Sequence, residues 1–273
     1  MSVPAHAHTK FRSHLSTPRA QLVVFFLLAF VIAWGTWLPA FLLPNFPKQL
    51  SMLGLFAPAI SGLLAAWIAN GRSGMAEILG RYKQWRFGVQ WYGLSIALIP
   101  VFFLLAVLLN GMLSAHPLEL FWVGSPLYFV LASFVWLMLI NSGEEIGWRG
   151  FGLPKLLATV KSPLLASLIL GVIWGLWHLP IYLLPGQSSF PYPLFLLLTI
   201  GSSFIYTALF IKTKGSLLPA VLLHASTDIG PRIFQIAKFT PAIWLTIDIF
   251  ILVTAIVLIV PAWIARQALA SKD

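Results

Sequence analysis

The 273-residue sequence contains no cysteine, which excludes disulfide bonds and thiolate chemistry. Charged residues are scarce as well: they make up 9% of the chain, against about 25% in soluble domains. Hydrophobic residues make up 59%, and the mean hydropathy is +0.92. These proportions predict an integral membrane protein without a soluble domain.

Acidic residues are the rarer charged type, seven against 17 Lys and Arg, so the net charge is +10. A basic chain can bind nucleic acid, but no stripe of basic residues interleaved with aromatic ones is present to hold a strand. We therefore interpret the excess as a topology signal and expect no nucleic-acid partner. Residues 1–20 are interpreted as a basic cytoplasmic tail before a retained first span, because no small-residue cleavage site follows that span.

The apolar runs predict an all-α, polytopic membrane protein of about eight transmembrane helices, forming one bundle over residues 21–265. Seven runs have the length of a span, and the eighth, 216–230, is marginal by itself. They lie near residues 21–43, 51–69, 91–110, 121–142, 163–184, 192–211, 216–230 and 242–264. The longest inside loop, 71–90, is expected to form a short interfacial amphipathic piece.

The distribution of basic residues supports eight crossings. With the N-terminus inside, fourteen Lys and Arg, Arg149 among them, fall on cytoplasmic segments and three fall outside. Without residues 216–230 as a span, Arg266 and Lys272 would move outside and weaken this bias. We therefore expect both termini in the cytoplasm, with the protein in a cell inner or plasma membrane.

Several ionisable residues lie in or beside the apolar runs, where they are candidates for function. They are Glu144, Glu145, His178, His224, Asp228 and Asp248.

The first candidate group is the stretch EEIGWR, residues 144–149. Glu145 and Arg149 are spaced i,i+4 and can pair on one face of a helix. A structural clamp at the end of the fourth span would need only that pair. Glu144 points about 100° away and needs a different partner.

The other two groups lie in later spans. His178, in the stretch WGLWHLP, could bond to a backbone carbonyl, and Pro180 is expected to kink its helix. His224 and Asp228, in HASTD, are spaced i,i+4 and could hydrogen-bond, which would fix the tautomer of the imidazole. A buried packing pair is the alternative interpretation of that spacing.

The sequence has no G-x-S-x-G and no H-E-x-x-H motif. What remains is a set of carboxylates and imidazoles drawn from three helices. Such a set can deprotonate a water molecule and stabilise the oxyanion that forms when the water attacks an amide.

In this order, E144-E145-x-x-x-R149, W174-x-x-x-H178 and H224-x-x-x-D228 resemble the motifs of the CPBP (CAAX-processing and bacteriocin-processing) intramembrane proteases. That family includes the type II CAAX prenyl endopeptidases and the abortive-infection proteins. The resemblance covers about residues 120–235 and implies a membrane endopeptidase whose active site lies inside the bundle.

The resemblance also implies roles for the residues. Glu144 would be the general base, assisted by His178, while Glu145 and Arg149 would hold the motif in place. His224 and position 228 would stabilise the oxyanion. The family often has Asn at position 228, and an ionised Asp228 cannot donate, so we expect it to orient His224 instead. Trp174, where Phe is common, is interpreted as a packing variation.

Other points stay open at this level. Glu144, His178 and His224 could supply a two-His, one-carboxylate zinc site, although no short His-to-His spacing pre-forms one; a metal-free, glutamate-dependent mechanism is the other reading. The implied partners are the bilayer and a membrane-embedded or lipidated peptide, either a prenylated CAAX protein or a leader peptide. The oligomeric state is not predicted. A proton-coupled transporter and a non-catalytic scaffold are the alternative functions.

The depth of the three groups is a further constraint. In upright helices Glu144 would lie near the inner face, His224 about 12 Å inside it and His178 about 22 Å inside it. Convergence therefore requires the fourth helix to continue past residue 142, or the fifth to tilt or to start outside the membrane.

Overall fold

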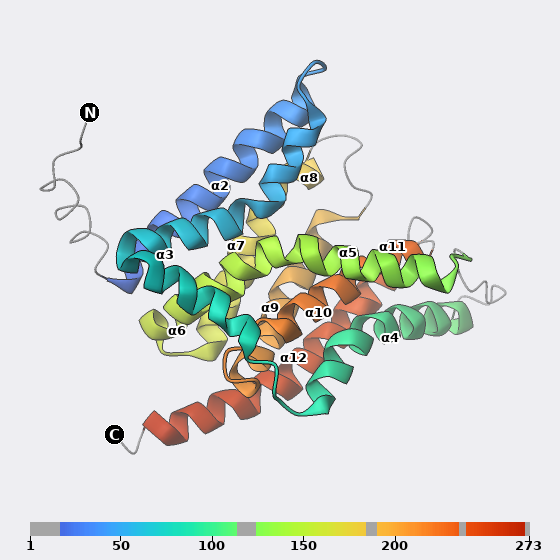
Figure 1. Cartoon of the computed structure of the whole chain (residues 1–273). Helices are drawn as coiled ribbons and strands as arrows, with labels where there is room; N and C mark the ends of the chain where they lie inside the picture. The colour runs from blue at the N-terminus through green and yellow to red at the C-terminus, as the bar shows by residue number, and fades with distance from the viewer. Residues whose placement is uncertain (1–16, 114–123, 184–189, 235–238, 271–273) are drawn as a thin grey trace, which may run out of the picture.

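The structure is a computed structural model that describes residues 17–113, 124–183, 190–234 and 239–270, and the regular elements in these ranges are all helices. The elements follow the chain as α2 (Pro18–Leu42), η1 (Lys48–Ser51), α3 (Met52–Gly80), η2 (Arg81–Lys83), α4 (Val89–Leu113), α5 (Leu127–Glu145), η3 (Ile146–Gly152), α6 (Leu153–Val160), α7 (Pro163–Trp177), α8 (Leu179–Leu183), α9 (Tyr192–Lys212), α10 (Leu218–Asp228), α11 (Gly230–Ile233) and α12 (Pro241–Ala270) (Figure 1).

Six helical stretches in the described ranges are long and apolar enough to cross a bilayer. They are Pro18–Leu42, Lys48–Lys83, Val89–Leu113, Leu127–Val160, Tyr192–Lys212 and Pro241–Pro261. The prediction of an all-helical polytopic membrane protein is thereby confirmed. Two of the predicted eight spans correspond to shorter helices, α7 with 15 residues and α10 with 11.

Large apolar side chains point outward from the helices at the edge of the bundle. Examples are Leu27 and Val31 on α2, Leu131 and Val135 on α5, and Val253, Ile256 and Val257 on α12. Continuous apolar surface of this kind is expected where helices face lipid instead of water.

The short helix α10 lies inside the bundle. It packs against α4, α5 and α9, and the residues from Pro219 to Ser226 are all buried. An 11-residue helix is only about 16 Å long, roughly half the hydrocarbon thickness of a bilayer. Because neighbouring helices surround α10, the backbone N–H and C=O groups at its ends are covered by protein and need not reach the water at the membrane surface.

The helix α3 changes direction at Gly71, whose φ of 63° and ψ of −148° are accessible only to glycine. Figure 1 shows the second part of α3 turning away from the first before the chain enters η2. This second part begins the segment 71–90, for which the sequence predicted a short amphipathic piece.

Helices α7 and α9 pack closely at the small residues of GVIWG. A Cβ atom on Gly171 would lie 2.7 Å from the Cα atom of Ile200, and one on Gly175 would lie 2.5 Å from a methyl group of Leu196. Small residues four positions apart are typical of such close contacts between helices in membranes.

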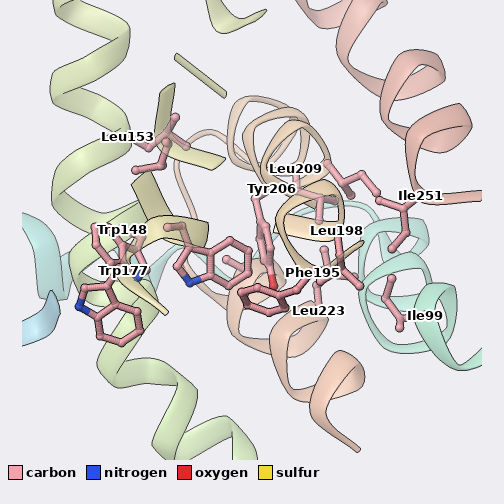
Figure 2. Close-up of a cluster of buried hydrophobic side chains, with 14 of the residues drawn as sticks. Ile99, Trp148, Leu153, Trp177, Phe195, Leu198, Tyr206, Leu209, Leu223 and Ile251 are labelled. Carbon is pink, nitrogen blue, oxygen red and sulfur yellow. The ribbon is translucent and has the colours of Figure 1, made fainter. Parts of the chain in front are cut away.

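The core of the bundle is rich in aromatic side chains. Trp148, Trp177 and Tyr206 are almost completely buried and come from three different elements, η3, α7 and α9 (Figure 2). Trp148 and Trp177 meet edge to face at 5.6 Å, and the indole N–H of Trp177 donates to the Ala29 carbonyl at 3.1 Å. This cluster joins α2 to the elements that carry the ionisable residues.

The first turn of α2 and the last turns of α12 lie on the same side of the bundle in Figure 1, together with α6. This placement of the two ends is the one expected for an even number of crossings.

Candidate active site

The fourth span does not end at residue 142. Helix α5 continues to Glu145, and the π-helix η3 carries the chain on to Gly152 before α6 begins. One condition for convergence of the ionisable residues, a fourth helix that continues inward, is therefore met. Arg149, which the topology count placed on a cytoplasmic segment, is 0% exposed within the bundle.

The π-helix allows its side chains to enter the bundle because its glycines let other helices come close. A Cβ atom on Gly147 would overlap the backbone of Pro58 in α3. Segments with π geometry are costly and occur often at functional sites. Here the π segment turns Trp148 and Arg149 into the core.

Glu145 and Arg149 form the predicted ion pair, with 2.9 Å between Oε1 and Nη1. Both side chains are fully buried. The guanidinium of Arg149 also lies 3.8 Å from the ring centre of Tyr206 and 4.5 Å from that of Trp174. Two aromatic faces and one carboxylate thus compensate a charge that is withdrawn from water.

The same Glu145 oxygen accepts a hydrogen bond from His224, with 2.8 Å between Oε1 and Nδ1. Because a carboxylate only accepts, Nδ1 carries the proton, and Nε2 is left to act on the far side of the ring. Glu145 therefore orients His224 and pairs with Arg149 at once.

Asp228 does not orient His224 through a hydrogen bond, which corrects the sequence-based expectation. Its Oδ2 lies 3.8 Å from Nε2 of His224, and it accepts instead from the Asn141 side chain at 2.9 Å. The reason is that Glu145 reaches His224 from α5, a contact that the i,i+4 spacing in α10 could not reveal.

Glu144 finds its separate partner in Trp174. The indole N–H donates to Oε2 of Glu144 at 2.7 Å. The interpretation of Trp174 as a packing variation was therefore wrong, because the residue supplies a polar contact that Phe could not make. The sequence did contain an indication of this contact, because a buried tryptophan usually needs an acceptor for its indole N–H.

His178 lies at the break between α7 and α8. Its Nδ1 donates to the Trp174 carbonyl at 2.9 Å, which leaves Nε2 of the neutral ring as an acceptor. Pro180 has no N–H, and the Trp177 carbonyl accepts from the indole of Trp34 at 2.9 Å instead of from the helix. The kink expected at Pro180 is confirmed.

Trp174 brings these groups together. Its ring centre lies 5.8 Å from that of His178 and 5.6 Å from that of His224, while its N–H holds Glu144. Glu144 is only 5% exposed, so its carboxylate does not face bulk solvent. In Glu144, Trp174 binds one carboxylate oxygen and leaves the other available. In both imidazoles, Nδ1 makes the hydrogen bond, and Nε2 has no hydrogen-bond partner among the described residues.

The residues do not fit a preformed metal site. Among the residues that the structure describes, no three His, Asp or Glu side chains are gathered closely enough to hold an ion. The zinc set considered from the sequence, Glu144 with His178 and His224, is therefore not assembled here, and we derive no chemical step through a metal.

Comparison with known proteins gives two findings. The sequence model of the family described as "Type II CAAX prenyl endopeptidase Rce1-like" matches residues 126–230. The chain is also 25% identical over 256 residues to CAAX prenyl protease 2 of Methanococcus maripaludis, across 86% of this chain and 92% of that protein. The matched residues 126–230 contain all three motifs described above.

Proposed function

Because this chain belongs to the Rce1-like type II CAAX prenyl endopeptidase family, a family of intramembrane proteases, we propose that it hydrolyses a peptide bond in a membrane-associated substrate with water activated by Glu144 and His178. The observation that carries this proposal is the meeting of Glu144, His178 and His224 around the buried indole of Trp174.

In the proposed reaction, one water molecule donates hydrogen bonds to Glu144 and to Nε2 of His178. Glu144 removes a proton as the water oxygen attacks the scissile carbonyl carbon. The same carboxyl group then delivers that proton to the departing nitrogen as the C–N bond breaks. The hydrogen bond from Trp174 to Oε2 supports this role, because it fixes one oxygen and leaves the other for the water.

His224 stabilises the oxyanion. In its imidazolium form, Nε2–H donates to the oxygen of the tetrahedral intermediate, while Nδ1–H remains on Glu145. Glu145 and Arg149 are positioning residues, since they hold His224 and do not meet the substrate. Asp228, held by Asn141, lines the approach to Nε2 of His224.

The substrate is a membrane-embedded or lipidated peptide, either a prenylated CAAX protein or a leader peptide. We further propose that residues 21–265 form one bundle of eight crossings with both termini in the cytoplasm. Its protease-like core spans about residues 120–235, which is supported by the family match over residues 126–230.

The test is a cleavage assay on the purified protein in detergent, with prenylated CAAX peptides and unprenylated leader peptides as substrates. We expect cleavage by the wild type and a loss of kcat of about 10²-fold or more in Glu144→Gln, the size of a general-base contribution. Because no step passes through a metal, the wild-type rate should survive a chelator.

A matched control keeps this result interpretable. The variant Glu77→Gln removes an exposed glutamate whose only charged contact among the described residues is Arg81, and it should cleave like the wild type. A Glu144→Gln protein that is folded and as fast as the wild type would refute the assignment. A proton-driven flux without any cleavage would support the transporter alternative instead.

A further inference from the structure

Asn141 supplies a buried amide at the contact between α5 and α10. The residue is only 4% exposed, and it lies one helical turn before Glu144 and Glu145. Because α5 packs against α10 here, its side chain reaches Asp228. The amide group carries two N–H bonds, and the Asp228 carboxylate accepts from one of them. The other N–H has no hydrogen-bond partner among the described residues.

Two donor nitrogens converge on one oxygen of Asp228. Its Oδ2 lies 2.9 Å from Nδ2 of Asn141 and 3.8 Å from Nε2 of His224. An amide N–H and an imidazolium N–H that point at one anionic oxygen form the arrangement that stabilises an oxyanion. The carboxylate oxygen of Asp228 therefore occupies the place suited to the oxygen of a tetrahedral intermediate.

The other side-chain donors of the site are engaged elsewhere. The indole N–H of Trp174 is bound to Glu144, the proposed general base. The guanidinium of Arg149 is paired with a carboxylate and is completely buried, so it does not meet a substrate. Of the donors described at the site, Asn141 is the one that can act beside His224.

The Asp228 carboxylate is free to turn away from these donors. Its side chain is 40% exposed, against 7% for that of His224. His224 keeps its orientation without Asp228, because Glu145 holds the opposite side of the imidazole at 2.8 Å. An ionised carboxylate is also repelled by an oxyanion that develops beside it. The Asp228 oxygen and the substrate oxygen are thus alternative ligands of the same two donors.

We infer that Asn141 is a catalytic donor to the oxyanion, acting together with His224, and that Asp228 occupies this oxyanion site until the substrate displaces it. The inference rests on the proposed protease function and adds one residue to its machinery. Asp228 then competes with the substrate and does not assist the reaction.

The first test is steady-state kinetics on a prenylated CAAX peptide that the wild type cleaves. We expect Asn141→Ala to lower kcat about 10²-fold, the size of the loss when one oxyanion donor is removed. Asp228→Ala should raise kcat/KM about tenfold, because the substrate no longer has to displace a charged hydrogen-bond partner of Asn141. The double variant should show the loss of kcat again. It also keeps the test valid if Asn141→Ala alone does not fold, since it leaves no carboxylate without its donor.

The three variants separate a direct role of Asn141 from an indirect one. If Asn141 served only to hold Asp228, then Asp228→Ala would lose as much activity as Asn141→Ala, and the double variant would lose no more. That outcome, or a folded Asn141→Ala enzyme with the wild-type kcat, would overturn the inference and leave the protease function intact. A wild type that cleaves no peptide would overturn the proposed function, and this inference with it.

A second measurement does not depend on turnover. A phosphinate analogue of the same peptide carries an anionic oxygen in the position of the oxyanion, so its affinity reports on the oxyanion donors. The wild type should bind this analogue more tightly than Asn141→Ala by about the factor lost in kcat. Equal affinities would contradict the inference.

Asn110 provides the matched control for both measurements. It is a half-buried amide on a different helix, α4, and it donates to Thr246 of α12 at 3.0 Å. Asn110→Ala should cleave the peptide and bind the phosphinate like the wild type. Melting curves in detergent show whether each variant is folded.

Discussion

The indole of Trp174 contacts nearly every group of the proposed site. Its N–H holds Glu144, its face lies against Arg149, and its edges approach both imidazoles. Phenylalanine would keep the ring contacts but lose the hydrogen bond. A single substitution therefore separates the packing role of this residue from its polar role.

We expect Trp174→Phe to lower kcat about tenfold, with KM nearly unchanged, because a hydrogen bond to a charged group contributes about 1.5–3 kcal/mol. Steady-state kinetics on the prenylated peptide measure both constants. A parallel melting curve in detergent is the control. A purely structural role would lower the melting temperature without lowering kcat selectively over KM. A Trp174→Phe enzyme with the wild-type kcat would show that the bond does not position Glu144.

Contacts within one helical turn could be predicted from the sequence, whereas contacts between distant segments could not. The Glu145–Arg149 pair follows from i,i+4 spacing, and the structure contains it. The bond from His224 to Glu145 joins residues 79 positions apart, and no local pattern encodes it. The prediction that Asp228 orients His224 was wrong for that reason. It chose the partner one helical turn away, whereas the actual partner, Glu145, lies on another helix.

At the scale of elements, the π-helix η3 depends on how closely α3 approaches it. Gly147 touches the Pro58 backbone, and Gly62 lies against the same segment. The sequence suggested an end to the fourth span here, because charges usually mark the membrane boundary. Here the charges of Glu145 and Arg149 pair inside the protein, so they do not mark the membrane boundary. The sequence therefore indicated the helical continuation to Gly152 only as one condition under which the ionisable residues could meet.

We expect Gly147→Ala to destabilise the protein and to reduce cleavage, because the new methyl group would force α3 and η3 apart and displace Glu144 and Glu145. Overpacking of this kind costs about 1–3 kcal/mol. The melting temperature in detergent and the cleavage rate of the surviving folded fraction are the measurements.

Gly35, inside α2, provides the comparison for this prediction. A Cβ atom there meets nothing within 4 Å, so Gly35→Ala should leave the protein as stable as the wild type, or more stable through helix propensity. If Gly147→Ala melts at the same temperature as Gly35→Ala and cleaves as fast, the close approach to α3 does not define the site.

At the scale of the whole molecule, hydropathy recovers the long spans but not the short helices. Each of the six long stretches overlaps a predicted run, because lipid-facing helices are largely apolar. Helix α10 is enclosed by α4, α5 and α9, so its backbone is covered by protein although the helix is too short to span the hydrocarbon layer. Its crossing was inferred from the basic residues of distant loops, and this inference can be tested directly.

The absence of cysteine makes that test simple, because each single-cysteine variant carries one label and the wild type carries none. Three exposed positions are suitable: Asn45 between α2 and η1, Ser73 in the second part of α3, and Ala242 in the first turn of α12. A membrane-impermeant maleimide applied to intact cells should label Asn45→Cys and Ala242→Cys. It should reach Ser73→Cys only after the membrane is permeabilised.

Each position reports a different part of the topology. Asn45 and Ser73 fix the orientation of α3, and a reversed pattern at both would invert the whole molecule and place its termini outside. Ala242 reports on α7 and α10 together, because the chain reaches α12 on the outer face if both short helices cross or if neither does, and on the inner face if only one of them crosses. Labelling of Asn45→Cys but not Ala242→Cys in intact cells would therefore reject eight crossings and require one of the two short helices, α7 or α10, to turn back within the membrane.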